Sequence, residues 1–133
     1  MKCISIRQPW AWMILHAGKD VENRTWTHPY RGPLLIHASS TMLKREYEQA
    51  CWWAANVAKC EVAIPAMTEL ETGGIIGMVD MTGITFDRSA SRWFDGPCGL
   101  KFANARALPF VPMRARLSIF EVETNIVNKL KLK

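Results

Sequence analysis

The stretch Gly18-Lys19-Asp20-Val21-Glu22-Asn23-Arg24 holds the densest group of charged and polar side chains in the chain. Its first residue, Gly18, suits the position just past a helix end, where a positive φ is needed. If residues 21–25 form a strand, side chains at even positions share one face, which brings Glu22 and Arg24 together. Lys19 stands at the entry to that strand, close enough to join them. The stretch therefore predicts a lysine–carboxylate–arginine cluster beside a helix terminus.

The segments before this cluster predict a strand and a short helix. Residues 3–6 alternate between apolar and polar side chains, as a strand does. Pro9 is well placed at the first turn of a helix. The apolar stripe of that helix follows helical spacing and consists of Trp10, Met13, Ile14 and Ala17.

The segments after the cluster alternate between the two kinds of element. A turn at residues 30–33 leads into a buried strand over 34–36, and a long helix continues to about residue 58. Ser39, Ser40 or Thr41 is expected to cap this helix. Residues 61–73 and 85–99 predict irregular connections. Further strands are expected at residues 74–82, 100–102, 107–112 and 117–122.

Strands thus dominate both ends of the sequence, and two main helices pack on them. The class is α+β, with a small mixed β-barrel of about five or six strands. At 133 residues the chain has the length of a single domain, expected over residues 1–133 with a frayed basic tail at 128–133. Apolar residues make up 49% of the chain, enough for a core. No apolar run approaches the ~18 residues of a membrane span, and we expect a cytoplasmic protein without membrane contact.

The four cysteines predict neither a disulfide framework nor a zinc site. They are scattered through the chain without a CxxC pair, and the three histidines do not complete a ligand set. We therefore expect free thiols, no bound metal and no cofactor.

The net charge of +5 is distributed unevenly along the chain. Residues 1–60 carry eight Lys or Arg against four Asp or Glu, residues 61–100 carry two against six, and residues 101–133 carry seven against two. If the two ends of the chain meet in the fold, they form a basic face that favours polyanions. An ordinary soluble surface with uneven charge is the alternative.

The residue types at Lys19, Glu22 and Arg24 also leave two interpretations open. Arginine offers a fixed fork of donors, glutamate accepts from an exocyclic amine, and lysine supplies a point charge, so the three can bind a phosphate or a base edge. The alternative is a surface salt bridge in which Lys19 is favoured by the negative end of the preceding helix.

The pattern Lys19-x-x-Glu22-x-Arg24 after Gly18 resembles the Gly-x-Lys-x-x-Glu-x-Arg signature of the ASCH family, with the Gly–Lys spacing one residue shorter. The resemblance extends to Ser5-Ile6-Arg7-Gln8-Pro9-Trp10-Ala11, to residues 30–39, to Gly77-Met78-Val79-Asp80 and to residues 93–99. It identifies the chain as a small stand-alone member of the bacterial or phage type. It implies a PUA-like barrel with a basic cleft beside the motif and a link to RNA.

The family resemblance implies two kinds of function. Some ASCH proteins are RNA- or DNA-binding modules, and others are small hydrolases, including an N4-acetylcytidine amidohydrolase and a ribonuclease. In the amidohydrolase pattern a Thr stands three residues after the Lys, where this chain has Glu22. A metal-independent hydrolase here would use Lys19 as the base and Glu22 to orient the nucleophile. Glu22 favours the charged ammonium, however, whereas ligand binding needs no neutral lysine.

We therefore predict an RNA- or nucleotide-binding domain, with hydrolysis in the same cleft as the alternative. The expected ligand-binding residues are Lys19, Glu22, Arg24, Arg31 and Trp12, the last as a base-stacking surface. Trp10 and His37 are interpreted as structural, and Asp95 as a residue that could line the cleft. One of Trp52 and Trp53 faces the core and the other a possible partner. The oligomeric state is left open between a monomer and a weak dimer.

Overall fold

The structure, a computed structural model, describes residues 1–132 and is built on one six-stranded sheet with the strand order β2-β5-β4-β3-β1-β6. The strands are β1 (Lys2–Ile6), β2 (Val21–Arg24), β3 (Gly32–Ala38), β4 (Gly74–Thr85), β5 (Cys98–Pro112) and β6 (Ile119–Glu121). The helices are α1 (Trp10–His16), α2 (Lys44–Asn56) and α3 (Thr124–Val127), with short 3₁₀ turns at Met67–Glu69 and Arg88–Ala90.

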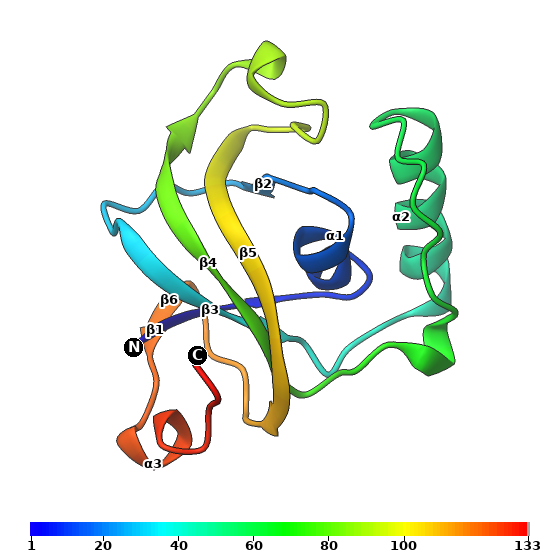
Figure 1. Cartoon of the computed structure of the whole chain (residues 1–133). Helices are drawn as coiled ribbons and strands as arrows, with labels where there is room; N and C mark the ends of the chain where they lie inside the picture. Colours follow the sequence, from blue (N-terminus) through cyan, green and yellow to red (C-terminus); the bar gives the residue numbers. More distant parts are fainter. Residues whose placement is uncertain (133) are drawn as a thin grey trace.

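The sheet is mixed and curls into a half-barrel. β1 and β3 run parallel, and every other neighbouring pair is antiparallel. The helix α1 lies against the hollow of the curl, and α2 lies on the far side of α1 (Figure 1). This arrangement confirms the predicted α+β class with about six strands and two main helices, to which the short α3 is added.

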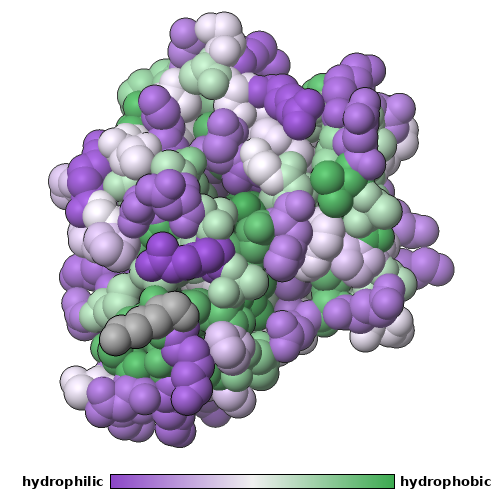
Figure 2. Space-filling model, viewed as in Figure 1, coloured by the Kyte–Doolittle hydropathy of each residue, from purple (hydrophilic) through white to green (hydrophobic). Residues whose placement is uncertain are grey.

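Strand alternation divides the core between the two faces of the sheet. Ile4 and Ile6 of β1 pack with Leu34 and Ile36 of β3 on the side of α1, whereas Cys3 and Leu35 point to the opposite face. A third apolar cluster joins α1 to α2. Figure 2 shows hydrophilic residues over most of one face of the molecule, with apolar residues in smaller patches between them. Among residues 1–132, no helix has the length and apolar character to cross a membrane.

The segments 100–102 and 107–112, expected as separate strands, belong to the single long strand β5. Three register shifts interrupt its pairing with β4, and Asn104 has a φ of +53°. Bulges of this kind bend a strand without ending it, because the extra residue increases the local twist. The expected strand 117–122 is shorter than predicted, since Ser118 has a φ of +59° and Leu117 is 94% exposed.

One further expectation is corrected. The hydroxyls at residues 39–41 do not cap α2, which begins at Lys44 after Leu43 and has no side-chain cap among the described residues. Ser39 instead accepts a hydrogen bond from the Thr41 amide at 3.3 Å, so it stabilises a turn before the helix. Within the tail expected at 128–133, Leu130 is 8% exposed and joins the apolar cluster on the outer face of the sheet. The frayed tail stays a prediction. Residue 133 lies outside the described residues.

Candidate ligand-binding site

The cluster at the start of β2 is a chain of three charges, of which Lys19 and Glu22 are buried and Arg24 is half-buried. Lys19 Nζ lies 3.1 Å from Glu22 Oε1, and Arg24 Nε lies 3.0 Å from Glu22 Oε2. The side chain of Lys19 is 2% exposed and that of Glu22 is 10% exposed. The predicted common face of Glu22 and Arg24 is therefore confirmed, and Lys19 joins them as expected.

Local backbone geometry positions Lys19. Gly18 has a φ of +74°, which turns the chain away from α1 as the sequence predicts. The Lys19 amide then donates to the Met13 carbonyl at 3.2 Å, so Lys19 stays against the helix end. From there, β2 pairs with β5, with Glu22 opposite Leu100 and Arg24 opposite Cys98.

The cluster keeps hydrogen-bonding capacity for a ligand. Lys19 Nζ donates to the Val21 carbonyl and to Glu22, and it lies 5.4 Å from the ring centroid of Trp10. An ammonium has three donors and each carboxylate oxygen has two lone pairs. One Lys19 donor and one lone pair on each Glu22 oxygen therefore have no partner within the cluster. Lys19 thus holds the Glu22 carboxylate in place, and the remaining lone pairs of Glu22 are acceptors.

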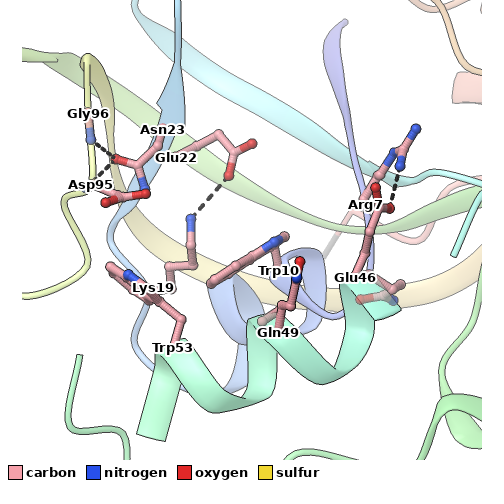
Figure 3. Close-up of a pocket in the computed structure, with 12 residues that line it drawn as sticks. Arg7, Trp10, Lys19, Glu22, Asn23, Glu46, Gln49, Trp53, Asp95 and Gly96 are labelled. Carbon is pink, nitrogen blue, oxygen red and sulfur yellow. Dashed lines mark hydrogen bonds and ion pairs between the residues drawn. The ribbon is translucent and has the colours of Figure 1, made fainter. Parts of the chain in front are cut away.

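Lys19 and Glu22 line a cavity of about 490 Å³ between β2, the two main helices and the loop before β5. This volume falls within the roughly 300–1,000 Å³ of small-molecule sites. Trp10 and Trp53 meet edge to face on one wall, with ring centroids 5.8 Å apart. Figure 3 shows the Lys19 amine directed at Glu22, and the Arg7–Glu46 ion pair at the opposite end of the cavity from Asn23. The other lining residues are Gln8, Gln49, Ala50, Asp95 and Gly96.

Two amide side chains fasten the edges of this cavity. Asn23 donates to the Trp93 carbonyl at 3.0 Å and accepts from the amides of Asp95 and Gly96, at 2.8 and 3.1 Å. Gln8, which is 3% exposed, accepts from the Trp12 amide and donates to the Glu71 carbonyl, both at 2.9 Å. The loop and the start of α1 are thus fixed by side chains that also face the cavity.

The 490 Å³ cavity is not the basic cleft that the sequence predicts. Its lining holds the cations Arg7 and Lys19 against three carboxylates, on Glu22, Glu46 and Asp95. Asp95 is exposed, and its carboxylate makes no ion pair with the other described residues. Asp95, which the sequence analysis names as a residue that could line the cleft, lines this cavity and brings a carboxylate from the acidic middle of the chain.

The basic groups gather instead in an adjoining cavity of about 530 Å³. It is lined by Arg7, Arg24 and Arg116 against the single carboxylate of Glu22. Arg116 lies close to Arg7 and Arg24 in the fold because β6 near the C-terminus pairs with β1. The two basic ends of the chain therefore meet in the fold, as the predicted basic face requires.

Two of the predicted ligand-binding residues, Arg31 and Trp12, do not line either cavity in the described part of the chain, residues 1–132. Arg31 is exposed, and its guanidinium donates to the carbonyls of His28 and Tyr30 in its own turn. The Trp12 ring lies beside that of His16, one turn along α1, with ring centroids 5.0 Å apart. Trp10 and Trp12 are two apart on the helix and therefore point to different sides. The cavity tryptophans are Trp10 and Trp53.

Trp52, the neighbour of Trp53, is 62% exposed, in agreement with the prediction that only one of the two faces inward. His37 is buried between two partners: its Nδ1 lies 2.9 Å from Ser5 Oγ, and its Nε2 lies 2.6 Å from the Met113 carbonyl. Burial lowers the pKa of His37 from its ordinary value of 6.5. These contacts agree with the structural interpretation of His37.

Some of the missed residues carry a signal in the sequence. Gln8 and Trp10 fall in the segment on which the family resemblance rests, and Asn23 falls inside the polar cluster. Gln49 and Trp53 gave none, because their place in the cavity depends on how α2 packs on α1. Within residues 1–132, no group of three or more His, Cys, Asp or Glu side chains is placed to hold a metal ion.

A curled mixed sheet with two helices and an ion-paired cluster beside the first one defines a small α+β domain of the PUA-like type. The chain belongs to the ASCH domain family, whose match covers residues 4–115.

Solved structures and one curated relative agree with this assignment. An ASCH protein from Zymomonas mobilis is similar with a TM-score of 0.58 at 13% identity, covering 96% of this chain and 91% of that chain. A tyrosine-to-phenylalanine mutant of the Zymomonas protein gives 0.56 at 12% identity, covering 96% and 94%. Over 38 residues the chain is 45% identical to human activating signal cointegrator 1; the match spans 29% of this chain and 6% of the human protein.

Proposed function

We propose that the protein binds RNA or a nucleotide-like ligand and receives a nucleobase in the 490 Å³ cavity. The observation that carries the proposal is the combination of a fixed carboxylate with two aromatic side chains in one cavity. Glu22 is held by two cations and keeps free lone pairs, which suit the exocyclic amine of a base. Trp10 and Trp53 supply apolar surface, and stacking on an aromatic side chain contributes about 1–3 kcal/mol per base.

The energetics of buried charge favour a binding role over a structural one. Replacing a buried ion pair by well-packed apolar residues is often neutral or stabilising, because removing charges from water costs about as much as their attraction returns. Stability alone therefore does not account for Lys19 and Glu22 in this place. A ligand that needs a positioned acceptor accounts for both residues.

The base preference tests the proposal. We expect cytidine and adenosine, which carry an exocyclic amine, to bind more tightly than uridine when each is titrated by calorimetry. We expect Trp53→Ala to weaken binding roughly tenfold or more. Trp52→Ala is the matched control, because it removes the neighbouring tryptophan from the exposed face of α2.

Circular dichroism of both variants separates lost binding from lost folding. Equal affinity for uridine and cytidine would contradict the role of Glu22. Equal effects of the two tryptophan substitutions would contradict the assignment of the cavity.

A hydrolase in the same cavity is the second candidate, and one observation favours it. The sequence could not place a second carboxylate, whereas Asp95 and Glu46 line the cavity with Glu22. Hydrolysis of N4-acetylcytidine would add water across the amide C–N bond and release acetate and cytidine. Incubation with N4-acetylcytidine and with single-stranded RNA, beside Lys19→Ala and Asp95→Asn, tests it. Product that forms equally in all samples would place any activity elsewhere.

A further inference from the structure

The two cavities adjoin, and together they are called the groove below. They share four lining residues, Arg7, Trp10, Glu22 and Asn23. The Glu22 carboxylate stands at the boundary, with Lys19 on the side of the 490 Å³ cavity and Arg24 on the side of the 530 Å³ cavity. A ligand that occupies the first cavity therefore has the second cavity directly beside it.

The second cavity has the donors that an anion needs. Arg24 uses Nε for Glu22 and Nη2 for the Ser5 carbonyl, so three of the five guanidinium donors remain. Arg116 lies 3.8 Å from Glu123, and both side chains are about two-thirds exposed, at 64% and 70%. An exposed pair at that distance contributes little and leaves Arg116 available. Ser39 and Ser118 add hydroxyl donors to the same lining.

We infer that the 530 Å³ cavity is a phosphate subsite, which binds the phosphate next to the base-bearing nucleoside of a single-stranded nucleic acid. This inference rests on the proposed function and extends it. Arginine forks and hydroxyls are the usual contacts of the phosphate backbone. The first cavity, with its excess of carboxylates, repels a phosphate. The charge of the groove therefore orients the ligand, with the base toward Trp53 and the phosphate toward Arg116.

The experiment compares nucleosides with their phosphates. Cytidine, its 3′- and 5′-monophosphates and a short single-stranded oligocytidine are titrated against the wild type, Arg116→Ala and Arg106→Ala. Arg106 is the matched control, because it is an exposed arginine of β5 outside both cavities. Circular dichroism checks that each variant is folded.

We expect at least one monophosphate and the oligomer to bind the wild type several-fold more tightly than cytidine. Arg116→Ala should remove most of that gain and leave cytidine binding unchanged, whereas Arg106→Ala should retain it. The slope of log K against log salt for the oligomer should fall by about 0.7 in Arg116→Ala, the value for one phosphate of a single strand.

Three outcomes overturn the inference. Monophosphates and oligomer that bind no better than cytidine would show that no phosphate is recognised. Equal losses in Arg116→Ala and Arg106→Ala would reduce the effect to general attraction by net charge. In both cases cytidine still binds, so the proposed function stands while the phosphate subsite fails. If no ligand binds the wild type, the proposed function and the subsite fail together.

Discussion

Glu22 is the residue on which the cluster depends, because it is the only acceptor between Lys19 and Arg24 in the chain of ion pairs. Removing one partner of a buried pair leaves an uncompensated charge, at a cost of about 3–5 kcal/mol. We expect Glu22→Ala to lower the free energy of unfolding by about this amount, measured by urea denaturation. Lys19→Met should cost less, since Glu22 keeps Arg24.

The exposed pair between Arg7 and Glu46 provides the control. Its side chains are 49% and 41% exposed, so Glu46→Ala should change the free energy of unfolding by less than about 1 kcal/mol. If Glu22→Ala proved as mild as Glu46→Ala, Lys19 would have to be hydrated in solution, and the role of Glu22 as a fixed acceptor would be lost.

His37 makes stability depend on pH. Burial lowers its pKa below 6.5, so the unfolded chain binds a proton more readily than the folded one. The contribution of His37 to the free energy of unfolding should therefore be constant at pH values well above 6.5 and fall as the pH drops through that value. We expect the melting temperature to decrease between about pH 7.5 and about pH 5.5. The decrease should be smaller in His37→Gln than in the wild type.

His16 serves as the comparison, because it is an exposed histidine at the end of α1. His16→Gln should retain the full acid sensitivity of the wild type. Acid sensitivity that persists unchanged in His37→Gln would assign the effect to carboxylates instead.

Strand alternation is strong enough to predict a site at the scale of single residues, but only along one strand. It brought Glu22 and Arg24 to one face, and the structure confirms it. Strand alternation does not predict that Trp53 lies near these two residues, since the position of α2 relative to β2 is set by packing. The sequence favours Trp12 over Trp10 as the base-stacking residue, because Trp10 follows the apolar stripe. In the structure Trp10 both packs on the core and lines the cavity.

At the scale of elements, β2 and the loop before β5 are held together by Asn23. Its three hydrogen bonds go to backbone groups of residues 93–96. We expect Asn23→Ala to accelerate hydrogen exchange of the Asp95 and Gly96 amides, measured by NMR, because both lose their acceptor. A buried group left without a partner costs about 1–3 kcal/mol.

Asn23→Asp separates the two halves of this link. The carboxylate still accepts from the Asp95 and Gly96 amides but no longer donates to Trp93. Exchange of the two amides should stay near the wild-type rate. Equal acceleration in Asn23→Asp and Asn23→Ala would mean that the loop is ordered mainly through Trp93.

The sequence predicts that an element exists where its apolar repeat continues over several residues. It does not predict where the element begins and ends. The stripe of α1 and the turn at Gly18 agree with the structure. The sequence predicts separate strands at 100–102 and 107–112. They are one strand in the structure, because a bulge around Asn104, and not a turn, lies between the two segments. A bulge depends on the partner strand, which no local pattern reveals.

At the scale of the whole molecule, the two ends of the chain lie side by side, which brings their basic residues together. The N-terminal amine and Lys2 both pair with Glu121 of β6, which fixes β1 beside the C-terminal segment. Arg116 therefore stands near Arg7 and Arg24, although it is far from them in sequence. The acidic middle of the chain supplies Asp95 to the other cavity. Segment charges predicted a basic face, and the fold divides the groove into two regions of different charge.

The C-terminal residues stabilise the sheet as a whole, and Leu130 tests this. Its side chain is 8% exposed and packs on the outer apolar cluster with Leu35 and Phe120. Leucine-to-alanine changes in a core cost about 2–5 kcal/mol, and a site near the chain end should lie at the lower limit. We expect Leu130→Ala to lower the free energy of unfolding by about 2 kcal/mol in urea. Lys129→Ala, an exposed neighbour, should change it by less than about 0.5 kcal/mol. If the two variants were equally stable, residues 128–132 would fray in solution, as the sequence alone suggests.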